Sequence, residues 1–287
     1  MGQRLRLIAM GTEHGNSSID LGGMSMRGIS TGGIRTCLEL PSWKLLVDVG
    51  AVDYHQVPAN TVLITHGHLD HLGGIANHIA LRELMGQKPG RYILPPEILA
   101  DVEDLLAVWR RLDKAPLQAE LIPLAPGEVL ELDRSKQVVP FAVDHRVVSQ
   151  GYLLYSRISK LLPVFEGLPG DDLARLRKSG QEITFEVNRV EFAFSGDTRI
   201  EGLLDNKKAL TAKRLVMEAT FLDERVGVEK ARSVGHIHLD EIREHADAFE
   251  CEHLVLTHLS LRYDRRQAWD LIRKVLPADL IDRTVIL

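Results

Sequence analysis

The sequence predicts an α/β fold, in which strands and helices alternate along the chain. Short runs rich in leucine and β-branched residues are typical of buried strands, and several are followed by segments with apolar residues at helical spacing. Of the 287 residues, 45% are hydrophobic and 26% are charged, as in a globular protein with a large core. Since no linker, repeat or low-complexity tract divides the pattern, we expect a single domain over residues 1–287.

Eight runs are predicted to be strands because they are short, apolar and bounded by turn residues or charges. They cover residues 44–50, 61–65, 91–95, 137–145, 151–156, 190–197, 214–220 and 252–258. The start of the chain, MGQRLRLIAMGTEHG, also indicates a strand that runs into a glycine turn.

Three segments are predicted to be helices from apolar residues spaced three or four apart, and they cover residues 96–111, 239–249 and 264–276. The first has a proline at its expected start, and the last has Asp264 as an expected N-cap.

Two segments are predicted to be irregular. Residues 11–33 contain seven glycines and no sustained periodicity, so we expect a loop over a surface or the mouth of a site. Residues 158–188 interrupt the strand pattern and contain LPGDDLARLRKSGQE, which indicates a short helix on an excursion from the body.

Composition restricts the function. The net charge of −5 gives no bulk basic field for nucleic acid, so any such contact must come from a local patch. The two cysteines, Cys37 and Cys251, are far apart in sequence, which favours a reducing compartment over a disulfide framework. There is no run of about 20 apolar residues. We therefore expect a cytoplasmic enzyme with no membrane contact.

The stretch ITHGHLDHLGG places four metal-capable side chains directly after a predicted strand: His66, His68, Asp70 and His71. Imidazole and carboxylate without thiolate suit an open, catalytic site for zinc or a similar cation. Four such residues within six positions indicate a metal site and not chance.

The remaining ligands are expected at the ends of other strands, since the cluster itself follows one. His145, Asp197 and His258 each end a predicted strand. Together with the cluster they make seven groups, enough for two metal ions with three ligands each and one shared carboxylate, as in two-metal hydrolases.

These motifs and their order resemble the metallo-β-lactamase fold superfamily, through HGHLDH, a lone histidine, SGDT and THLSLRY. Within it the chain resembles the ribonuclease Z family, which processes tRNA 3′ ends, through HRVVSQGYLLYS, FAFSGDTR, MEATF, GHIH and LVLTHLSLRY. The resemblance implies a four-layer αββα sandwich. It also implies that His66, His68 and His145 hold one zinc ion, that Asp70, His71 and His258 hold the other, and that Asp197 bridges them.

The same resemblance implies roles for residues downstream of the ligands. Glu218 in MEAT and His236 in GHIH match the pair that supplies a proton to the leaving 3′ oxygen. Arg262 in SLRY matches an arginine that contacts phosphate, for which a guanidinium is well suited. Asp70 lies where it can accept a proton as well as bind metal.

Some positions differ from the family pattern. MEAT stands in place of HEAT, Ile237 and His238 replace a hydroxylated pair, and the N-terminal loop lacks the family's proline and arginine-asparagine signature. The interval between His145 and Asp197 is shorter than usual in the family, which inserts its tRNA-binding arm there. Residues 158–188 are therefore expected to form at most a shortened arm.

The leading hypothesis is thus a binuclear zinc phosphodiesterase that acts as an endoribonuclease on precursor tRNA 3′ ends. The alternative is the same machinery acting on a small phosphodiester such as a cyclic nucleotide. A di-iron redox protein on this fold usually has glutamate where His68 stands, and a metal-free scaffold would lack ligands. The family suggests a homodimer, and manganese or iron stays possible in place of zinc.

Overall fold

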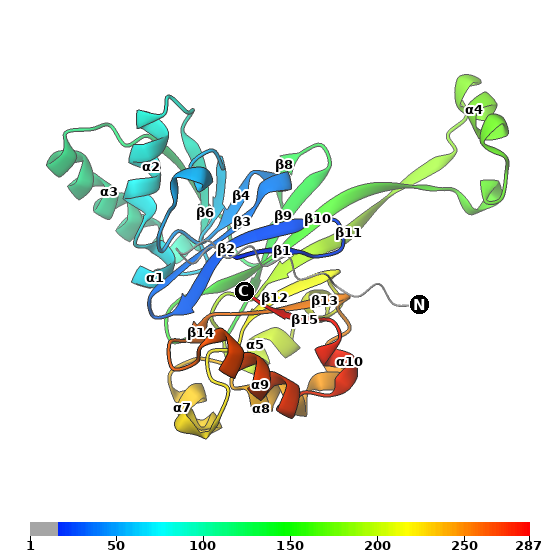
Figure 1. Cartoon of the computed structure of the whole chain (residues 1–287). Helices are drawn as coiled ribbons and strands as arrows, with labels where there is room; N and C mark the ends of the chain where they lie inside the picture. Colours follow the sequence, from blue (N-terminus) through cyan, green and yellow to red (C-terminus); the bar gives the residue numbers. More distant parts are fainter. Residues whose placement is uncertain (1–16) are drawn as a thin grey trace.

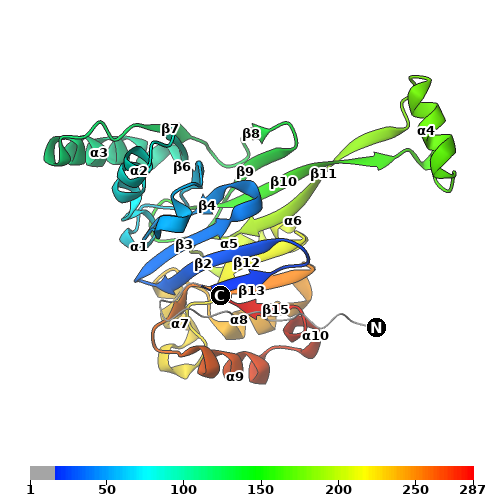
Figure 2. The same ribbon diagram turned by 45° about the horizontal axis from the view of Figure 1, so that its top comes forward.

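The computed structural model describes residues 17–287 and contains two β-sheets packed face to face, with helices on both outer sides (Figures 1 and 2). Three hydrophobic clusters fill the spaces: one between the sheets, and one between each sheet and its helices. The four-layer αββα sandwich expected from the sequence is therefore confirmed. The strand expected within residues 1–15 lies outside the described residues.

The first sheet has eight strands in the described part of the chain, with β1 to β7 in sequence order and β14 beside β2. The strands are β1 (Ser17–Asp20), β2 (Ser25–Gly32), β3 (Arg35–Leu40), β4 (Leu45–Val47), β5 (Thr61–Leu63), β6 (Gly90–Leu94), β7 (Ala119–Pro123) and β14 (Leu259–Ser260). Helices α1 (Leu69–Leu72), α2 (Ile75–Leu84) and α3 (Leu99–Asp113) accompany it.

The second sheet has seven strands in the order β15-β13-β12-β11-β10-β9-β8. They are β8 (Leu130–Asp133), β9 (Lys136–Ala142), β10 (Gln150–Leu161), β11 (Thr184–Phe194), β12 (Arg214–Glu218), β13 (His253–Thr257) and β15 (Thr284–Ile286). The helices of this half are α5 (Ile200–Leu204), α6 (Lys207–Leu210), α7 (Val228–Ser233), α8 (Leu239–Glu244), α9 (Arg265–Val275) and α10 (Ala278–Ile281), and most lie below the sheets in Figure 1.

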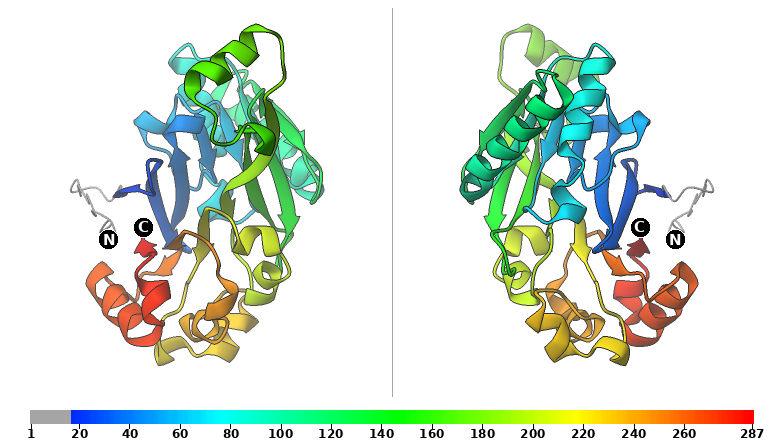
Figure 3. Two further views of the ribbon diagram at one scale, coloured as in Figure 1. Left: turned by 90° about the vertical axis from the view of Figure 1, so that its right-hand side faces the viewer. Right: turned by 90° about the vertical axis from the view of Figure 1, so that its left-hand side faces the viewer.

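Strands β10 and β11 continue beyond the body as a long antiparallel hairpin, whose tip carries α4 (Gly170–Lys178) (Figures 1 and 3). The short helix expected in this segment is present. The expected break in the strand pattern is wrong at both ends, since β10 runs to Leu161 and β11 begins at Thr184. These strand ends leave the body and are half-buried or exposed, so the sequence there carries no buried-strand pattern.

The eight predicted strands and three predicted helices coincide with observed elements, and Asp264 caps α9 by accepting a hydrogen bond from Gln267 N. The loop expected over residues 11–33 is wrong in its described part, which forms the β1–β2 hairpin. Gly28 permits close packing of β2 on β3, because a Cβ atom there would lie 2.1 Å from the carbonyl oxygen of Cys37.

The two sheets bring the ends of their strands together at one edge. Strands β4, β5 and β6 run parallel in one sheet, and β11, β12 and β13 run parallel in the other. The sheets meet closely where these strands end: Gln150 N donates to Thr65 O at 3.0 Å, and a Cβ atom at Gly196 would lie 2.9 Å from Thr65 Cβ. Side chains from several strand ends can therefore reach a single point.

None of the described helices is both long enough and apolar enough to cross a bilayer.

Candidate active site

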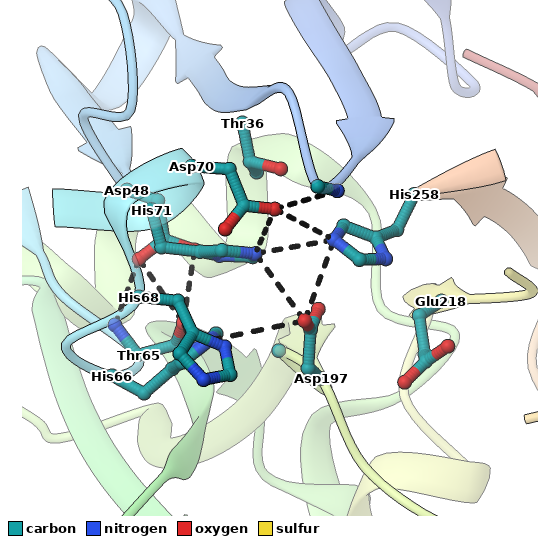
Figure 4. Close-up of polar contacts among 12 residues, drawn as sticks. Thr36, Asp48, Thr65, His66, His68, Asp70, His71, Asp197, Glu218 and His258 are labelled. Carbon is teal, nitrogen blue, oxygen red and sulfur yellow. Dashed lines mark hydrogen bonds and ion pairs between the residues drawn. The ribbon is translucent and has the colours of Figure 1, made fainter. Parts of the chain in front are cut away.

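The seven predicted ligands converge at this edge and form two groups. Figure 4 labels six of them, all but His145. One group contains His66, His68, His145 and Asp197, and the other contains Asp70, His71 and His258. Within each group the candidate ligand atoms all lie within 4.8 Å of one another. A further group that meets the same criterion contains Asp197, His236 and His258. The assignment of ligands to each ion stays a prediction.

Loops after four strands supply these side chains. The HGHLDH stretch follows β5 and leads into α1, whose first turn carries Asp70 and His71. His145 lies beyond the end of β9, Asp197 beyond β11, and His258 directly after β13. Because each group follows a strand held in a sheet, the sheets fix the spacing of the ligands.

Four of the five ligand histidines are held by a hydrogen bond on Nδ1, so that Nε2 faces the centre. The partners of Nδ1 are Thr65 Oγ1 for His66 (2.9 Å), Asp48 Oδ2 for His71 (2.7 Å), Gly235 O for His145 (2.8 Å) and Thr220 Oγ1 for His258 (2.9 Å). The two threonine hydroxyls donate their own hydrogen to Asp48 and Glu218, so both accept from the histidine. Each Nδ1 therefore carries the proton, and each Nε2 lone pair is free for a metal ion.

His68 differs because it turns Nδ1 toward the centre, 3.0 Å from His66 Nε2 and 3.4 Å from His145 Nε2. In the second group, His258 Nε2 lies 3.2 Å from His71 Nε2 and 3.3 Å from Asp70 Oδ2. Two ligand atoms bound to one tetrahedral zinc ion lie about 3.4 Å apart. The spacing of both groups thus fits a divalent metal ion at each centre.

Asp197 lies between the two groups and directs one oxygen toward both. Its Oδ2 atom is 3.7 Å from His66 Nε2, 3.4 Å from His71 Nε2 and 3.3 Å from His258 Nε2. The side chain is almost fully buried. A carboxylate oxygen in this position can be shared by two cations.

Burial and neighbouring charges shift the pKa values of the candidate ligands in different directions. Burial, with the charge of His71, lowers the pKa of His66, and burial lowers the pKa of His145. Burial opposes ionisation of Asp197, but His258 and His71 outweigh it and hold the pKa of this carboxyl well below its usual range. The pKa of His71 is raised, since Asp197 and Asp48 outweigh the effect of burial. The raised pKa favours a second proton on the His71 ring. A metal ion bound to His71 would take the place of this proton, because the negative charges of Asp197 and Asp48 attract both.

Two residues at the site have left-handed backbone conformations that non-glycine residues rarely adopt: Asp48 with φ 60° and His258 with φ 59°. Hydrogen bonds hold both. Asp48 accepts from Thr65 N at 2.8 Å, and His258 N donates to Ser30 Oγ at 3.0 Å. Strained backbone at a ligand and at the partner of a ligand is typical of a functional site.

Glu218 and His236 form the pair expected from the sequence, with His236 Nδ1 2.9 Å from Glu218 Oε1. The His236 ring lies between the rings of His145 and His258, with centroids 5.3 Å from each. Burial disfavours the charged imidazole, but Glu218 outweighs this effect and raises the pKa of His236. The pair is thus placed at the edge of the two predicted metal positions.

Arg262 is exposed, and its guanidinium donates to Ser260 Oγ at 2.9 Å. It follows His258 by four positions, but no hydrogen bond or ion pair joins its side chain to a predicted ligand. Its role in binding phosphate stays a prediction.

Sequence patterns alone did not identify the residues that orient the ligands: Asp48, Thr65, Thr220 and Gly235. Asp48 had a signal that could identify it as a site residue, because it directly follows strand β4. Asp197 likewise stands just beyond the end of a strand, three positions after the last residue of β11. Gly235 has φ +86°, and a Cβ atom there would lie 2.7 Å from His145 Nδ1, so a glycine is needed beside this ligand. The two threonines carried no signal, since threonine is common in strands and caps.

Comparison with known proteins places the chain in a family. Residues 44–259 match the model of the beta-lactamase superfamily domain. The chain is 40% identical over 259 residues to chloroplastic tRNase Z TRZ2 of Arabidopsis thaliana, covering 90% of this chain and 73% of that protein. It is 38% identical over 262 residues to tRNase Z TRZ1 of the same plant, covering 91% and 94%. The chain belongs to the tRNase Z family.

Solved structures agree with this fold. The short form of human tRNase Z superposes with a TM-score of 0.57 at 20% identity, covering 82% of this chain and 92% of that one. The metallo-beta-lactamase fold protein YhfI of Bacillus subtilis gives a TM-score of 0.59 at 15% identity, covering 90% and 93%. Because both identities are low, these two structures show only that this tRNase Z family member shares their fold.

Replacing Asp48 by Asn should weaken metal binding by about 10- to 100-fold, since the charge that orients His71 is lost while the ligands remain. Asparagine tolerates the left-handed backbone at this position, so the fold should be kept. Titration with a competing chelator measures the change. Asp205→Asn, an exposed carboxylate after α5, is the matched control. Unchanged metal affinity in Asp48→Asn would mean that Asp48 has no part in the site.

Proposed function

We propose that this protein is an endoribonuclease that uses two zinc ions to cleave precursor tRNA on the 3′ side of the tRNA body. The observation that carries the proposal is the Glu218–His236 pair, 2.9 Å apart and beside the shared carboxylate of Asp197. The names of the relatives at 38–40% identity support the same substrate.

The chemistry follows from the positions of these groups. Divalent ions held by the seven predicted ligands would lower the pKa of a bound water molecule to about 7 and so supply a nucleophile near neutral pH. His236, oriented by Glu218 through Nδ1, holds a proton on Nε2 for the leaving 3′ oxygen. Asp70 accepts a hydrogen bond from Gly33 N at 2.8 Å and can take the proton that the nucleophile loses.

Zinc and a count of two ions per chain are also proposals. The donor set of five histidines and two aspartates without thiolate favours zinc in an open, catalytic site. Each ion would have three ligands of its own and share Asp197.

The projecting hairpin of β10, α4 and β11 is proposed to contact the tRNA body, as a shortened form of the family's arm. Its tip helix has Arg175, Arg177 and Lys178 in the last turn and two aspartates in the first. The basic turn can neutralise RNA phosphates far from the metal site. Such a contact would favour a large RNA over a small phosphodiester.

Other expectations stay predictions. A homodimer can be tested by sedimentation of the purified chain. A cytoplasmic location also needs a direct test, since one relative is named chloroplastic. The small-phosphodiester alternative is tested by a direct comparison of turnover on precursor tRNA and on a cyclic nucleotide.

Asp197→Ala should lose both metal ions, because the two cations would then face each other with less negative charge between them. Metal content per chain, measured by mass spectrometry, should fall from about two toward zero. Asp205→Ala serves as the control. A variant that keeps two ions and full activity would contradict the binuclear site.

His236→Ala should lower turnover of precursor tRNA by about 10²–10⁴-fold, the usual loss for a general acid, and leave the metal content unchanged. The loss should be much smaller on bis(p-nitrophenyl) phosphate, because nitrophenolate departs without a proton. Glu218→Gln should give a weaker form of the same pattern. If His236→Ala strips the metal or slows both substrates equally, His236 is not the general acid.

Replacing residues 162–183 by Asn-Gly should lower kcat/KM for precursor tRNA by at least about tenfold, through loss of the arm's phosphate contacts. Leu161 and Thr184 are paired across the hairpin, so a two-residue turn can join them. The rate on bis(p-nitrophenyl) phosphate, measured in parallel, should stay within about twofold, since the site lies in the body. Full activity of the shortened chain on precursor tRNA would show that the arm does not bind substrate.

A further inference from the structure

Several arginines lie beside the candidate active site, and three of them are paired with carboxylates. The pairs are Arg199 with Asp144 (2.6 Å), Arg232 with Glu201 and Glu241, and Arg225 with Asp223 (2.9 Å). Arg146 is different, because no carboxylate of the described residues lies within ion-pair distance of it. It is exposed to solvent and directly follows the predicted ligand His145.

The stem of Arg146 packs over Gly235. A Cβ atom built on Gly235 would lie 3.1 Å from Arg146 Cγ. The carbonyl oxygen of Gly235 holds His145, and the next residue is His236. Arg146 therefore lies on the side of the site where the general acid and the ligand His145 meet.

Arg146 directly follows the predicted ligand His145, so its exposed positive charge stands at the rim of the candidate metal site. A cation that approaches a predicted metal position, with no carboxylate to neutralise it, is unfavourable unless an anion binds there. In a two-metal phosphodiesterase that anion is a phosphate group of the substrate, which a guanidinium can hold through two hydrogen bonds.

We propose that Arg146 binds the phosphate one nucleotide upstream of the scissile one. This inference rests on the proposed function. His236 gives its proton to the leaving 3′ oxygen, so the nucleotide that carries this oxygen lies on the side of His236. The other phosphate of that nucleotide, on its 5′ oxygen, is then the one that Arg146 reaches, since its stem packs over Gly235 beside His236. Arg146 thus places the leaving nucleotide against the general acid.

The test removes the charge of the single phosphate that Arg146 is proposed to bind. Precursor tRNA is prepared with the natural linkage, or with a neutral methylphosphonate at the linkage one nucleotide upstream of the cut. On the natural RNA, Arg146→Ala should lower kcat/KM by about 10- to 100-fold, as expected for a lost charged hydrogen bond. On the methylphosphonate RNA, wild type and Arg146→Ala should agree within about twofold, since the partner charge is already absent.

Further variants distinguish a loss of phosphate binding from damage to the fold or to the metal site. Arg146→Lys should be intermediate, because it keeps the charge and loses the two-pronged geometry. Arg146→Ala should hydrolyse bis(p-nitrophenyl) phosphate at the wild-type rate and keep its metal, since that substrate has no upstream phosphate. Arg111→Ala, which removes an exposed arginine from α3, should match wild type on every substrate.

Two results would overturn the inference. One is an equal loss from Arg146→Ala on natural and methylphosphonate RNA, which would place the side chain elsewhere. The other is an equal loss on the nitrophenyl diester, which would mean that the metal site itself is disturbed. Failure of the proposed function is seen separately, because the wild-type protein would then hydrolyse the small diester without cutting precursor tRNA.

Discussion

The close approach of the two sheets at Thr65 and Gly196 is the constraint on which the site depends. Tyr152 of the second sheet donates a hydrogen bond to Ile64 O of the first at 2.6 Å, and Gln150 N donates to Thr65 O. Gly196 has φ +61° and leaves no room for a side chain against Thr65. Any separation of the sheets would move Asp197 away from the histidines that follow β5. The interior packing and the metal site are therefore held by the same contacts.

Glu218 connects the two functions of the site. One of its oxygens accepts from His236 Nδ1, and the other accepts from Thr220 Oγ1, which in turn accepts from the ligand His258. Backbone N–H groups of Thr198 and Ile237 also donate to this carboxylate. The proposed general acid and one predicted metal ligand are thus connected to the same buried carboxylate. The contact with His236 is direct, whereas His258 is reached only through Thr220, so activity and metal content have to be compared in the same preparation.

The sequence predicted most of the site because its ligands obey a simple rule: each follows a buried strand, and strand ends meet at one edge of a sandwich. Asp48 obeys the same rule and was missed only because no second ligand stood near it. The β1–β2 hairpin was missed for a physical reason, since a glycine in a strand against a close neighbour resembles a glycine in a loop. Contacts such as that of Arg146 with Gly235 depend on tertiary packing, which leaves no trace in local patterns.

The distribution of charge explains how an acidic protein can bind RNA. The net charge of −5 gives no long-range attraction for a polyanion such as RNA. At physiological salt, exposed charges more than about 8 Å apart are also largely screened from each other. Attraction must therefore come from positive groups close to the bound strand. Arg199, Arg225 and Arg232 are neutralised by carboxylates, so they hold loops in place and add little field. Arg146 and Arg262 follow ligands of different metal positions and have no such partner among the described residues. These two arginines thus stand close to the candidate metal site without a neutralising carboxylate, so they can attract the phosphate chain of an RNA bound there.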